Sequence, residues 1–401
     1  MKEYLWIGSF STDEVNKTLQ GWGYNNAAQH IAQKNLLEGL EYELKCSFTC
    51  IGSIMLPDTV SIKKVDTIRF GHNESENDVL VGYRNIRYLN RLSASRNVGD
   101  EIRKYLKKIE SNTEMIVFMY EMRGMCFNVA QLIREYHPNS KIYMFVPDLP
   151  MFMSGSYTLI KHLLKHIDYK IMQRKTKYID KYILFTEPMA EYLKINKSQY
   201  IVMEGSININ EINNSTPNIA EYTTGTDVVF MYSGIIDESY GLIELIEAFK
   251  KLPSHYKLWI TGDGVSAEKV RLLSDGEKII YYGFLDSRKK VLEKQKKATA
   301  LINLRNPNED SSKYCFPSKL FEYMRSGRVV LSTRIQGIPS EYYHYLIEIK
   351  DVTVNEITKA VLKVAEMTEK DRDELAYSAK RYIEEKKNNI VQTRRIIEEL
   401  L

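Results

Sequence analysis

The sequence predicts an α/β protein with two doubly wound parallel sheets. Short apolar runs alternate with longer amphipathic segments along the chain, and they form two series. A stretch rich in Asn, Ser, Thr and Ile, residues 208–226, separates the series. At 401 residues the chain is also too long for one ordinary core. Strand–helix alternation favours parallel sheets covered on both faces, so two series indicate two such domains.

The expected strands are the apolar runs that are bounded by turn residues. They comprise residues 4–10, 43–51, 67–71, 115–120, 141–146, 182–186, 200–204, 228–233, 257–261, 279–282, 300–304, 329–333 and 346–349. Helical patterns include residues 27–40, 241–251 and 266–273. The expected organisation is a first domain at 1–207, a linker at 208–226, a second domain at 227–370, and a helical segment at 371–401 that packs back on the first domain.

Composition excludes several classes of protein. The net charge of +4 is too small to indicate nucleic-acid binding. Four cysteines in a chain of this length do not make a disulfide framework, and buried free thiols are expected. Residues 1–8 are too short and too charged for a signal peptide, and no window offers eighteen apolar residues. We therefore expect a cytoplasmic protein.

The most informative segment is residues 315–324, which are predicted to form a loop followed by a helix that Pro317 opens. Ser318, Lys319 and the free backbone N–H groups at such a helix start attract an anion. Glu322 lies four residues after Ser318, about 6 Å further along the same face. That spacing suits a ligand with a phosphate group at one end and a ribose diol at the other.

Glycines follow several strands of the second series. Gly234, Gly262 and Gly264 would place backbone N–H groups at the mouth of the second sheet, although strand-to-helix turns use glycine in any case. Gly283 and Phe284 end the next strand, where an aromatic ring could neighbour a base or belong to the core. These positions are therefore candidates for contact with a nucleotide.

Arg305 ends another strand, directly before the 315–324 segment. An arginine there can pair with phosphate oxygens through two parallel hydrogen bonds. The alternative is a solvated surface arginine, but its position at a strand's carboxyl end beside Lys319 favours phosphate binding.

In the first series, Gly21, Trp22, Gly23 and Tyr24 form a turn ahead of a helix, and could approach a phosphate or sugar closely. A plain tight turn is the alternative. Asp148 follows another strand and is the best polar candidate near an acceptor, although a turn or capping role suits it equally.

Two further patterns have simpler explanations. Asp371 and Asp373 have a D-x-D spacing that could hold a metal, but they lie in a polar run typical of a solvated helix face, so no metal site is expected. Residues 156–181 form an amphipathic pattern with many lysines. It could lie on an anionic membrane surface, or be a packing helix with a basic outer face.

The second half resembles the family 4 (group 1) glycosyltransferases, which have the GT-B architecture, and in particular the branch that builds bacterial capsular, exopolysaccharide or O-antigen chains. The tract from Asn303 and Arg305 through residues 316–322 to residues 337–339 carries the resemblance. The resemblance implies a nucleotide-sugar donor in the second domain, retention of anomeric configuration and no bound metal or other cofactor.

The resemblance also implies roles for residues. Ser318 and Lys319 would hold the diphosphate, Glu322 the ribose, and Gly283 with Phe284 would lie near the base. Tyr314, Phe316, Pro317 and Leu320 belong to the same donor tract, and the acceptor would meet Gly21, Trp22, Gly23, Tyr24 and Asp148. The sequence departs from the family at Tyr314, where many members have Glu, at Pro147, where a His is common, and at Ile235 and Tyr240, where cations are usual.

With those cations missing, Arg305 and Lys319 are the expected groups that stabilise the leaving nucleotide. We expect a transferase that uses a UDP-sugar and a saccharide acceptor, which would be lipid-linked if the protein is peripheral on the inner membrane face. The alternative is a non-catalytic glycosyltransferase-like subunit that supports an active partner.

Overall fold

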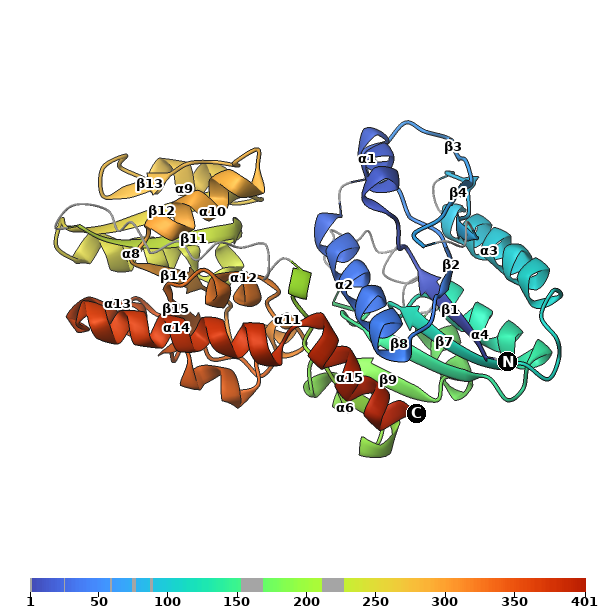
Figure 1. Cartoon of the computed structure of the whole chain (residues 1–401). Coiled ribbons are helices and arrows are strands. Elements are labelled where there is room, and N and C mark those ends of the chain that lie inside the picture. Colours follow the sequence, from blue (N-terminus) through green and yellow to red (C-terminus); the bar gives the residue numbers. More distant parts are fainter. Residues whose placement is uncertain are drawn as a thin grey trace. The chain divides into compact units, whose positions relative to one another are not determined.

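The computed structural model describes residues 2–24, 26–57, 60–73, 77–86, 89–152, 169–210 and 227–401. The chain divides into two compact units (Figure 1). The first unit comprises Met1–Ser206 with Asn389–Leu401, and the second comprises Ile207–Asn388. The predicted linker, 208–226, lies outside the described residues from 211 onward. The predicted basic helix, 156–181, lies outside them up to residue 168.

The first unit contains an eight-stranded sheet in the order β10-β9-β8-β7-β1-β2-β5-β4 and a two-stranded sheet of β3 and β6. All neighbours in the larger sheet are parallel except β4 and β5. The strands of the unit are β1 (Lys2–Gly8), β2 (Thr49–Gly52), β3 (Lys64–Val65), β4 (Ile68–Phe70), β5 (Asp78–Leu80), β6 (Tyr83–Arg84), β7 (Glu114–Tyr120), β8 (Lys141–Val146), β9 (Lys181–Leu184) and β10 (Tyr200–Val202).

The helices of this unit are α1 (Asp13–Gly21), α2 (Ala27–Leu44), α3 (Asn90–Leu106), α4 (Gly124–Tyr136), α6 (Pro188–Leu193) and α15 (Asn389–Leu400), with short 3-10 turns η1 (Thr176–Tyr178) and η2 (Lys197–Gln199). The expected strand at 43–51 is wrong in its first half, because α2 continues to Leu44 and β2 begins only at Thr49. Lys45 ends the helix in a left-handed conformation, with a φ of 50°, so the run predicted as one strand contains a helix end.

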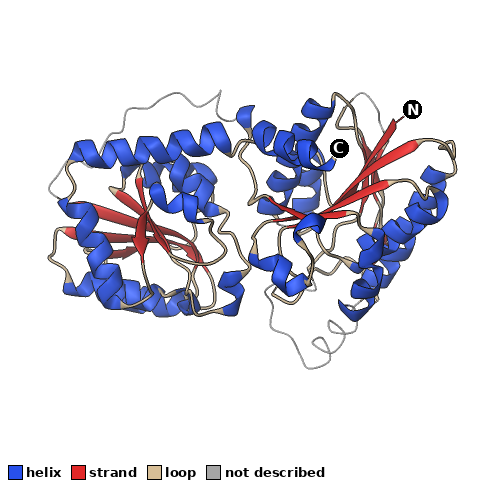
Figure 2. Ribbon diagram, turned by 90° about the horizontal axis from the view of Figure 1, so that it is seen from below, coloured by secondary structure: helices blue, strands red, loops and turns tan. Residues whose placement is uncertain are grey.

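The second unit is a six-stranded parallel sheet in the order β13-β12-β11-β14-β15-β16. Figure 2 shows its strands between layers of helices. The strands are β11 (Val228–Ile235), β12 (Tyr256–Asp263), β13 (Ile279–Tyr281), β14 (Ala300–Asn303), β15 (Val329–Thr333) and β16 (Ile347–Ile349). The helices are α8 (Leu242–Lys251), α9 (Ala267–Leu273), α10 (Arg288–Lys297), α11 (Asp310–Lys313), α12 (Lys319–Arg325), α13 (Val354–Glu366) and α14 (Glu369–Lys386), with 3-10 turns η3 (Glu238–Tyr240) and η4 (Ser340–His344).

The segment 371–401 does not behave as one helix that packs on the first domain. Its first part is α14, whose Ala379 and Ile383 are buried in the second unit's core with Leu320 and Met324. The chain then breaks near Asn388, and α15 lies beside α2 in the first unit (Figure 1). The segment is divided between the units because the break makes two separate helices, and each of them buries its own apolar stripe in a different unit.

In both sheets the strand order reverses at one point. The first sheet grows outward from β1 toward β2 and from β7 toward β8, so its switch point lies between β1 and β7. The second sheet has the same arrangement between β11 and β14. Open parallel sheets bind ligands beyond the carboxyl ends of their strands at such a point. Functional side chains are therefore expected at the two switch points.

Candidate functional site

A pocket of about 140 Å³ lies at the carboxyl ends of β11 and β14, at the switch point of the second sheet. It is enclosed by the ends of the two strands, by η3 and by the loop that leads into α12. Its lining residues are Tyr232, Ser233, Gly234, Ile235, Tyr240, Ile302, Asn303, Leu304, Arg305, Pro317, Ser318, Lys319 and Tyr323. Among these described residues there are two cations and no carboxylate, so the pocket is suited to an anion.

Lys319 is the first residue of α12 and lies in the pocket wall. Its Nζ donates to the backbone oxygen of Ser233 at 2.7 Å. Although much of the Lys319 side chain is exposed, its ammonium is turned inward onto the end of β11. Burial of this ammonium lowers the pKa of Lys319, and the nearby Glu322 carboxylate opposes that effect. The charge is thus held at the pocket rather than in solvent.

Arg305 follows β14 directly and stacks on the ring of Tyr240, with its Cζ 4.0 Å from the ring centroid. Its backbone N–H donates to Thr333 Oγ1 at 2.9 Å, which fixes the chain where it leaves the sheet. Within the described part of the chain, no carboxylate forms an ion pair with Arg305. A guanidinium held by an aromatic face and without a counterion keeps its N–H groups available to a ligand.

Ser233 is a centre of hydrogen bonding, a role that the sequence did not reveal. The hydroxyl oxygen of Tyr323 lies 2.7 Å from the backbone oxygen of Ser233, 2.9 Å from its Oγ and 3.0 Å from its N. Burial raises the pKa of Tyr323 well above its usual value, so the phenol stays protonated. The only sequence signal was the position of Tyr323 one turn after Lys319, on the buried side of α12.

Glu322 lies one turn after the start of α12, next to the pocket but outside its lining. Its Oε1 accepts from Gln295 Nε2 at 2.9 Å, and its Oε2 lies 3.4 Å from Arg288 Nε. Gln295 and Arg288 belong to α10, which sequence reasoning did not connect with the site. The Glu322 side chain is 22% exposed, so it is partly accessible.

Some residues of the predicted donor segment line the pocket, and others are buried in the core of the second unit. Pro317 and Ser318 line the pocket, whereas Phe316 packs on Phe321 and Tyr342, and Leu320 is fully buried. The Leu320 N–H donates to the oxygen of Pro317 at 2.8 Å. Leu320 and Phe316 therefore stabilise the segment through packing. The helix also begins at Lys319 rather than at Pro317, and its seven residues make a small dipole.

The other predicted donor positions lie apart from the pocket lining, except Gly234. Phe284 is 73% exposed, and Tyr314 follows the last residue of α11. Gly262 and Gly264 serve the sheet, because a Cβ atom there would come within 1.7 Å of Gly234 O and 2.3 Å of Ile236 O. The Gly283 carbonyl accepts hydrogen bonds from the N–H of Gly262 and the hydroxyl of Thr261.

Two positions at which the resemblance leads to an expectation of cations, Ile235 and Tyr240, line the pocket. Ile235 is 56% exposed at the end of β11, so it supplies an apolar edge to the pocket. Tyr240 ends η3 and supports Arg305 through the ring contact already described. Tyr240 thus helps to hold the Arg305 guanidinium at the pocket.

In the first unit, Gly21 ends α1, and Trp22, Gly23 and Tyr24 form the turn that leads to α2, so the segment follows a helix rather than β1 directly. Gly23 has a φ of +84° and therefore needs glycine. Tyr24 is buried, and its hydroxyl donates to Gln29 Oε1 at 3.2 Å. The turn is ordered by these contacts.

Glu121 follows β7 at the switch point of the first sheet, and sequence reasoning missed it. It has a φ of 76°, rare for a residue other than glycine, and only 8% of it is exposed. Its carboxylate accepts from Gln29 Nε2 at 2.5 Å and pairs with Arg123. Burial raises its pKa, Arg123 opposes this, and the exposed Asp148 at the end of β8 adds to the rise. A strained, buried carboxylate at this position is typical of functional sites.

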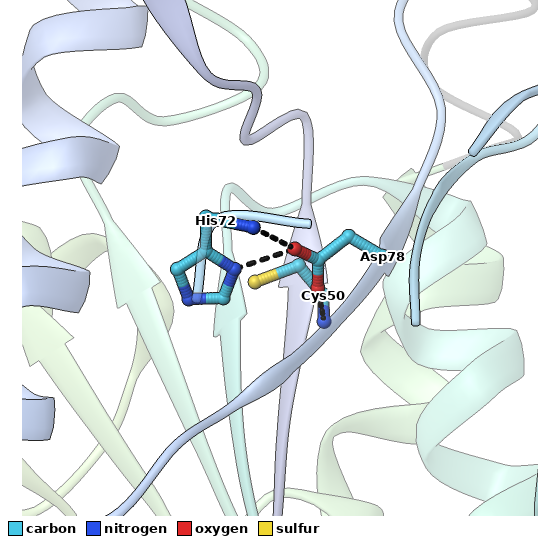
Figure 3. A group of neighbouring side chains, drawn as sticks. All are labelled: Cys50, His72 and Asp78. Carbon is cyan, nitrogen blue, oxygen red and sulfur yellow. Dashed lines mark hydrogen bonds and ion pairs between the residues drawn. The ribbon is translucent and has the colours of Figure 1, made fainter. Parts of the chain in front are cut away.

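One group of described side chains could hold a metal by residue type: Cys50, His72 and Asp78, whose ligand atoms lie within 4.8 Å of one another (Figure 3). The ring of His72 is already bonded on both sides, with Nδ1 2.5 Å from Asp78 Oδ2 and Nε2 3.0 Å from Glu41 Oε1. Burial alone would lower the pKa of His72, but the hydrogen bonds to the two carboxylates outweigh it and raise that pKa to about 9. We therefore interpret His72 with Asp78 and Glu41 as an ion-pair clamp, that is, a cluster of ion pairs that stabilises the fold.

The two aspartates of the D-x-D pattern lie on an exposed face of α14, as predicted for a solvated helix. Asp371 and Asp373 are exposed near the start of α14, and Thr368 caps that helix by accepting from the Asp371 N–H at 3.1 Å. Asp371 Oδ2 also accepts from the Thr368 hydroxyl at 2.7 Å. Capping accounts for Asp371.

The chain is similar to known proteins in part of its sequence and in its structure. Residues 227–367 match the family model "Glycosyl transferases group 1", a stretch that contains every residue of the pocket. No curated protein matches the chain. The apo form of the lipopolysaccharide outer core galactosyltransferase WaaB is similar in structure, with a TM-score of 0.64 and 14% identity over 100% of this chain and 99% of that one.

Two further structures are similar. The OtsA apo structure has a TM-score of 0.66 and 12% identity over 100% of this chain and 99% of its own. Anabaena Alr3699/HepE in complex with UDP has a TM-score of 0.59 and 10% identity over the same shares. The fold is GT-B. The predicted fold class is therefore confirmed, and the match over residues 227–367 supports a glycosyltransferase.

Proposed function

We propose that this GT-B protein is a retaining, metal-independent glycosyltransferase that moves a sugar from a UDP-sugar to a saccharide acceptor. The observation that carries the proposal is the pocket between the ends of β11 and β14, in which Lys319 and Arg305 face a space without carboxylates among its described lining residues. The pocket lies inside the stretch that matches the group 1 family.

The two cations explain how the donor bond could break. Cleavage of a sugar–diphosphate bond leaves negative charge on the departing nucleotide, and prepositioned cations stabilise that charge in a low-dielectric pocket. Lys319 is held by Ser233 and Arg305 by Tyr240, so both charges are in place before the donor binds. Two fixed cations supply the electrostatic stabilisation that a metal ion would otherwise give, which supports the proposed independence from metal.

Glu322 is proposed to bind the ribose hydroxyls. Its carboxylate lies one helical turn from Lys319, about 5 Å along the axis, which is the separation between a diphosphate and a ribose on one nucleotide. UDP is favoured as the nucleotide because the structures of HepE and of the E. coli trehalose-6-phosphate protein were determined with UDP and UDP-2-fluoro glucose.

The acceptor is proposed to meet the first unit at the carboxyl ends of β1, β7 and β8, where Glu121 and Asp148 lie. A saccharide in bacterial surface polysaccharide synthesis is proposed, in keeping with WaaB, which is a lipopolysaccharide outer core galactosyltransferase. Among the described helices, none is long and apolar enough to cross a membrane. Attachment to a lipid surface through residues 156–181 rests on the sequence pattern alone.

Titration of the purified chain with UDP and GDP, followed by thermal denaturation, tests the donor site. We expect UDP to raise the melting temperature. Incubation with a panel of UDP-sugars should then release UDP slowly by hydrolysis, and the anomeric configuration of the product, read by NMR, tests retention. A chain that responds to no nucleotide contradicts the proposal.

The alternative of a non-catalytic subunit is favoured by Ile235 and Tyr314, which stand where the family has charged residues. That function predicts nucleotide binding without hydrolysis of any donor in the panel, and activity only in a partner protein. The hydrolysis measurement therefore separates the two functions.

A further inference from the structure

Gln295 is the only fully buried side chain on α10, a helix in which seven of the ten residues are charged. The apolar Val291 and Leu292 of the same helix are only half-buried. A helix that serves packing alone places its apolar residues at the most buried position, because burying an amide costs stability unless its hydrogen bonds are made. A glutamine at this position therefore needs an explanation.

The hydrogen bonds of Gln295 supply one. Its Nε2 donates to Glu322 Oε1 at 2.9 Å and to Ser233 Oγ at 3.1 Å, so the amide bridges α12 and the end of β11. Its Oε1 is buried without a partner in the described structure. The carbonyl oxygen of Gln295 thus stays unpaired among the described residues, while both N–H groups of the same amide donate hydrogen bonds to Ser233 and Glu322.

Ser233 and Glu322 each contact another charged group. The backbone oxygen of Ser233 accepts from Lys319 Nζ at 2.7 Å. Glu322 Oε2 lies 3.4 Å from Arg288, whose side chain is 54% exposed and can follow the carboxylate into solvent. Without Gln295, the half-exposed Arg288 would be the remaining partner of Glu322, and the carboxylate would be free to turn outward.

We propose that Gln295 is a positioning residue that holds the Glu322 carboxylate in register with Lys319, so that the ribose and the diphosphate of one nucleotide are bound together. The proposal rests on the proposed function, because it deepens the role of the same donor site. Gln295 does not contact the nucleotide in this account. It acts through Glu322 and, by way of Ser233, keeps the carboxylate at a fixed distance from the ammonium.

Affinity for UDP and for 2′-deoxy-UDP, measured by calorimetry, tests the proposal. The unmodified protein should prefer UDP by about tenfold or more, since a hydrogen bond to a charged group is lost in the deoxy form. Glu322→Ala should bring the ratio of the two affinities close to one. Gln295→Leu should reduce it to a similar extent, and Gln295→Leu combined with Glu322→Ala should cause no further loss, because both changes break one chain of contacts.

Gln295→Glu provides a readout that a purely structural role would not move. The carboxyl group that this change introduces can donate to Glu322 when it is protonated, as the amide does, whereas it repels Glu322 when it is ionised. The affinity of this variant for UDP relative to 2′-deoxy-UDP should therefore be nearly normal at about pH 5.5 and should fall as the pH rises to about 8. One carboxyl group of such a pair loses its shared proton over this range. The unmodified protein should show no such fall over that range.

Glu293→Ala is the matched control, because Glu293 is exposed on the same helix and should leave the preference unchanged. If the unmodified protein binds no UDP, the proposed function fails whatever Gln295 does. If it prefers UDP and Gln295→Leu keeps the full preference, or the Gln295→Glu preference does not change with pH, the positioning role is wrong while the donor site stands. Should Gln295→Leu not fold, the isosteric Gln295→Glu decides alone.

Discussion

Lys319 donates its ammonium hydrogen bond to the backbone oxygen of Ser233, at 2.7 Å, across 86 residues of sequence. The contact joins the start of α12 to the end of β11 and places a positive charge at the switch point of the second sheet. A lysine that binds a main-chain carbonyl in this way does not neutralise its charge, so the charge remains available to an anion.

Substitution of this lysine should remove donor activation without unfolding the chain. We expect Lys319→Ala to lower kcat for donor hydrolysis or transfer by about 100- to 1,000-fold, the loss usual when one preorganised donor to a developing charge is removed. Lys289→Ala, which changes an exposed lysine on α10, is the control and should be near normal. Near-normal turnover of Lys319→Ala would exclude it as the stabilising cation.

Tyr240 should matter for its ring rather than its hydroxyl group. Because Arg305 Cζ lies 4.0 Å from the ring centroid, Tyr240→Phe should keep donor KM close to that of the unmodified protein. Tyr240→Leu should raise KM by about 2- to 30-fold, as expected from a cation–π contact of about 0.5–2 kcal/mol. Equal effects of the two changes on initial rates would show that the hydroxyl group, not the ring, is used.

The lowered pKa of Lys319 predicts a direction for pH dependence. Burial of the ammonium brings its deprotonation closer to neutral pH, and only the protonated form attracts a diphosphate. UDP affinity should therefore weaken as the pH rises into the alkaline range. The Lys319→Arg variant should lose this dependence, since a guanidinium stays charged throughout. Calorimetric titration across pH measures both, and parallel profiles for the two proteins would contradict the assignment.

His72 predicts a pH effect on stability. Its folded pKa is raised from 6.5 to about 9, so its stabilising contribution is complete below the unfolded pKa and is lost as the pH rises through the folded one. The full shift corresponds to at most about 3 kcal/mol, and screening by solvent reduces it. The difference in free energy of unfolding between the unmodified protein and His72→Gln should shrink by up to this amount between about pH 6 and about pH 10. Urea denaturation measures it, and a constant difference would contradict the clamp.

Gly262 tests whether the strand-end glycines serve the fold or a ligand. A side chain there would clash with Gly234 O, and its φ of +143° is unsuited to other residues. Gly262→Ala should therefore destabilise the second unit by several kcal/mol, visible as a lower melting temperature. Gly21→Ala has open space around its new Cβ atom and is the control. A stable Gly262→Ala protein with lost nucleotide binding would favour a ligand role instead.

Much of the fold could be predicted because the strands of parallel sheets are apolar throughout. Residues 141–146 and 329–333 were predicted with the bounds that β8 and β15 have. Failures occurred where one run crossed an element boundary, as at residues 43–51, and where strands had only two residues, as in β3 and β6. Such strands are too short for a periodic pattern and depend on their partners.

The candidate site could be predicted only in part. Arg305, Ser318, Lys319 and Gly234 were identified and line one pocket, because each follows a strand end or begins a helix. Gln295 and Glu121 were missed. A glutamine within a lysine-rich helix and a glutamate after a strand carry no local signal, since their burial depends on distant parts of the chain.

The sequence by itself determined the alternation of strands and helices, the two sheets and the polar residues at their carboxyl ends, since these follow from local periodicity and turn chemistry. Only the tertiary structure decided that Lys319 binds Ser233, that Tyr240 supports Arg305, and that Gln295 holds Glu322. The physical reason is that each contact joins residues far apart in the chain. Their distance is set by how the sheet and its helices pack, which no short window of sequence encodes.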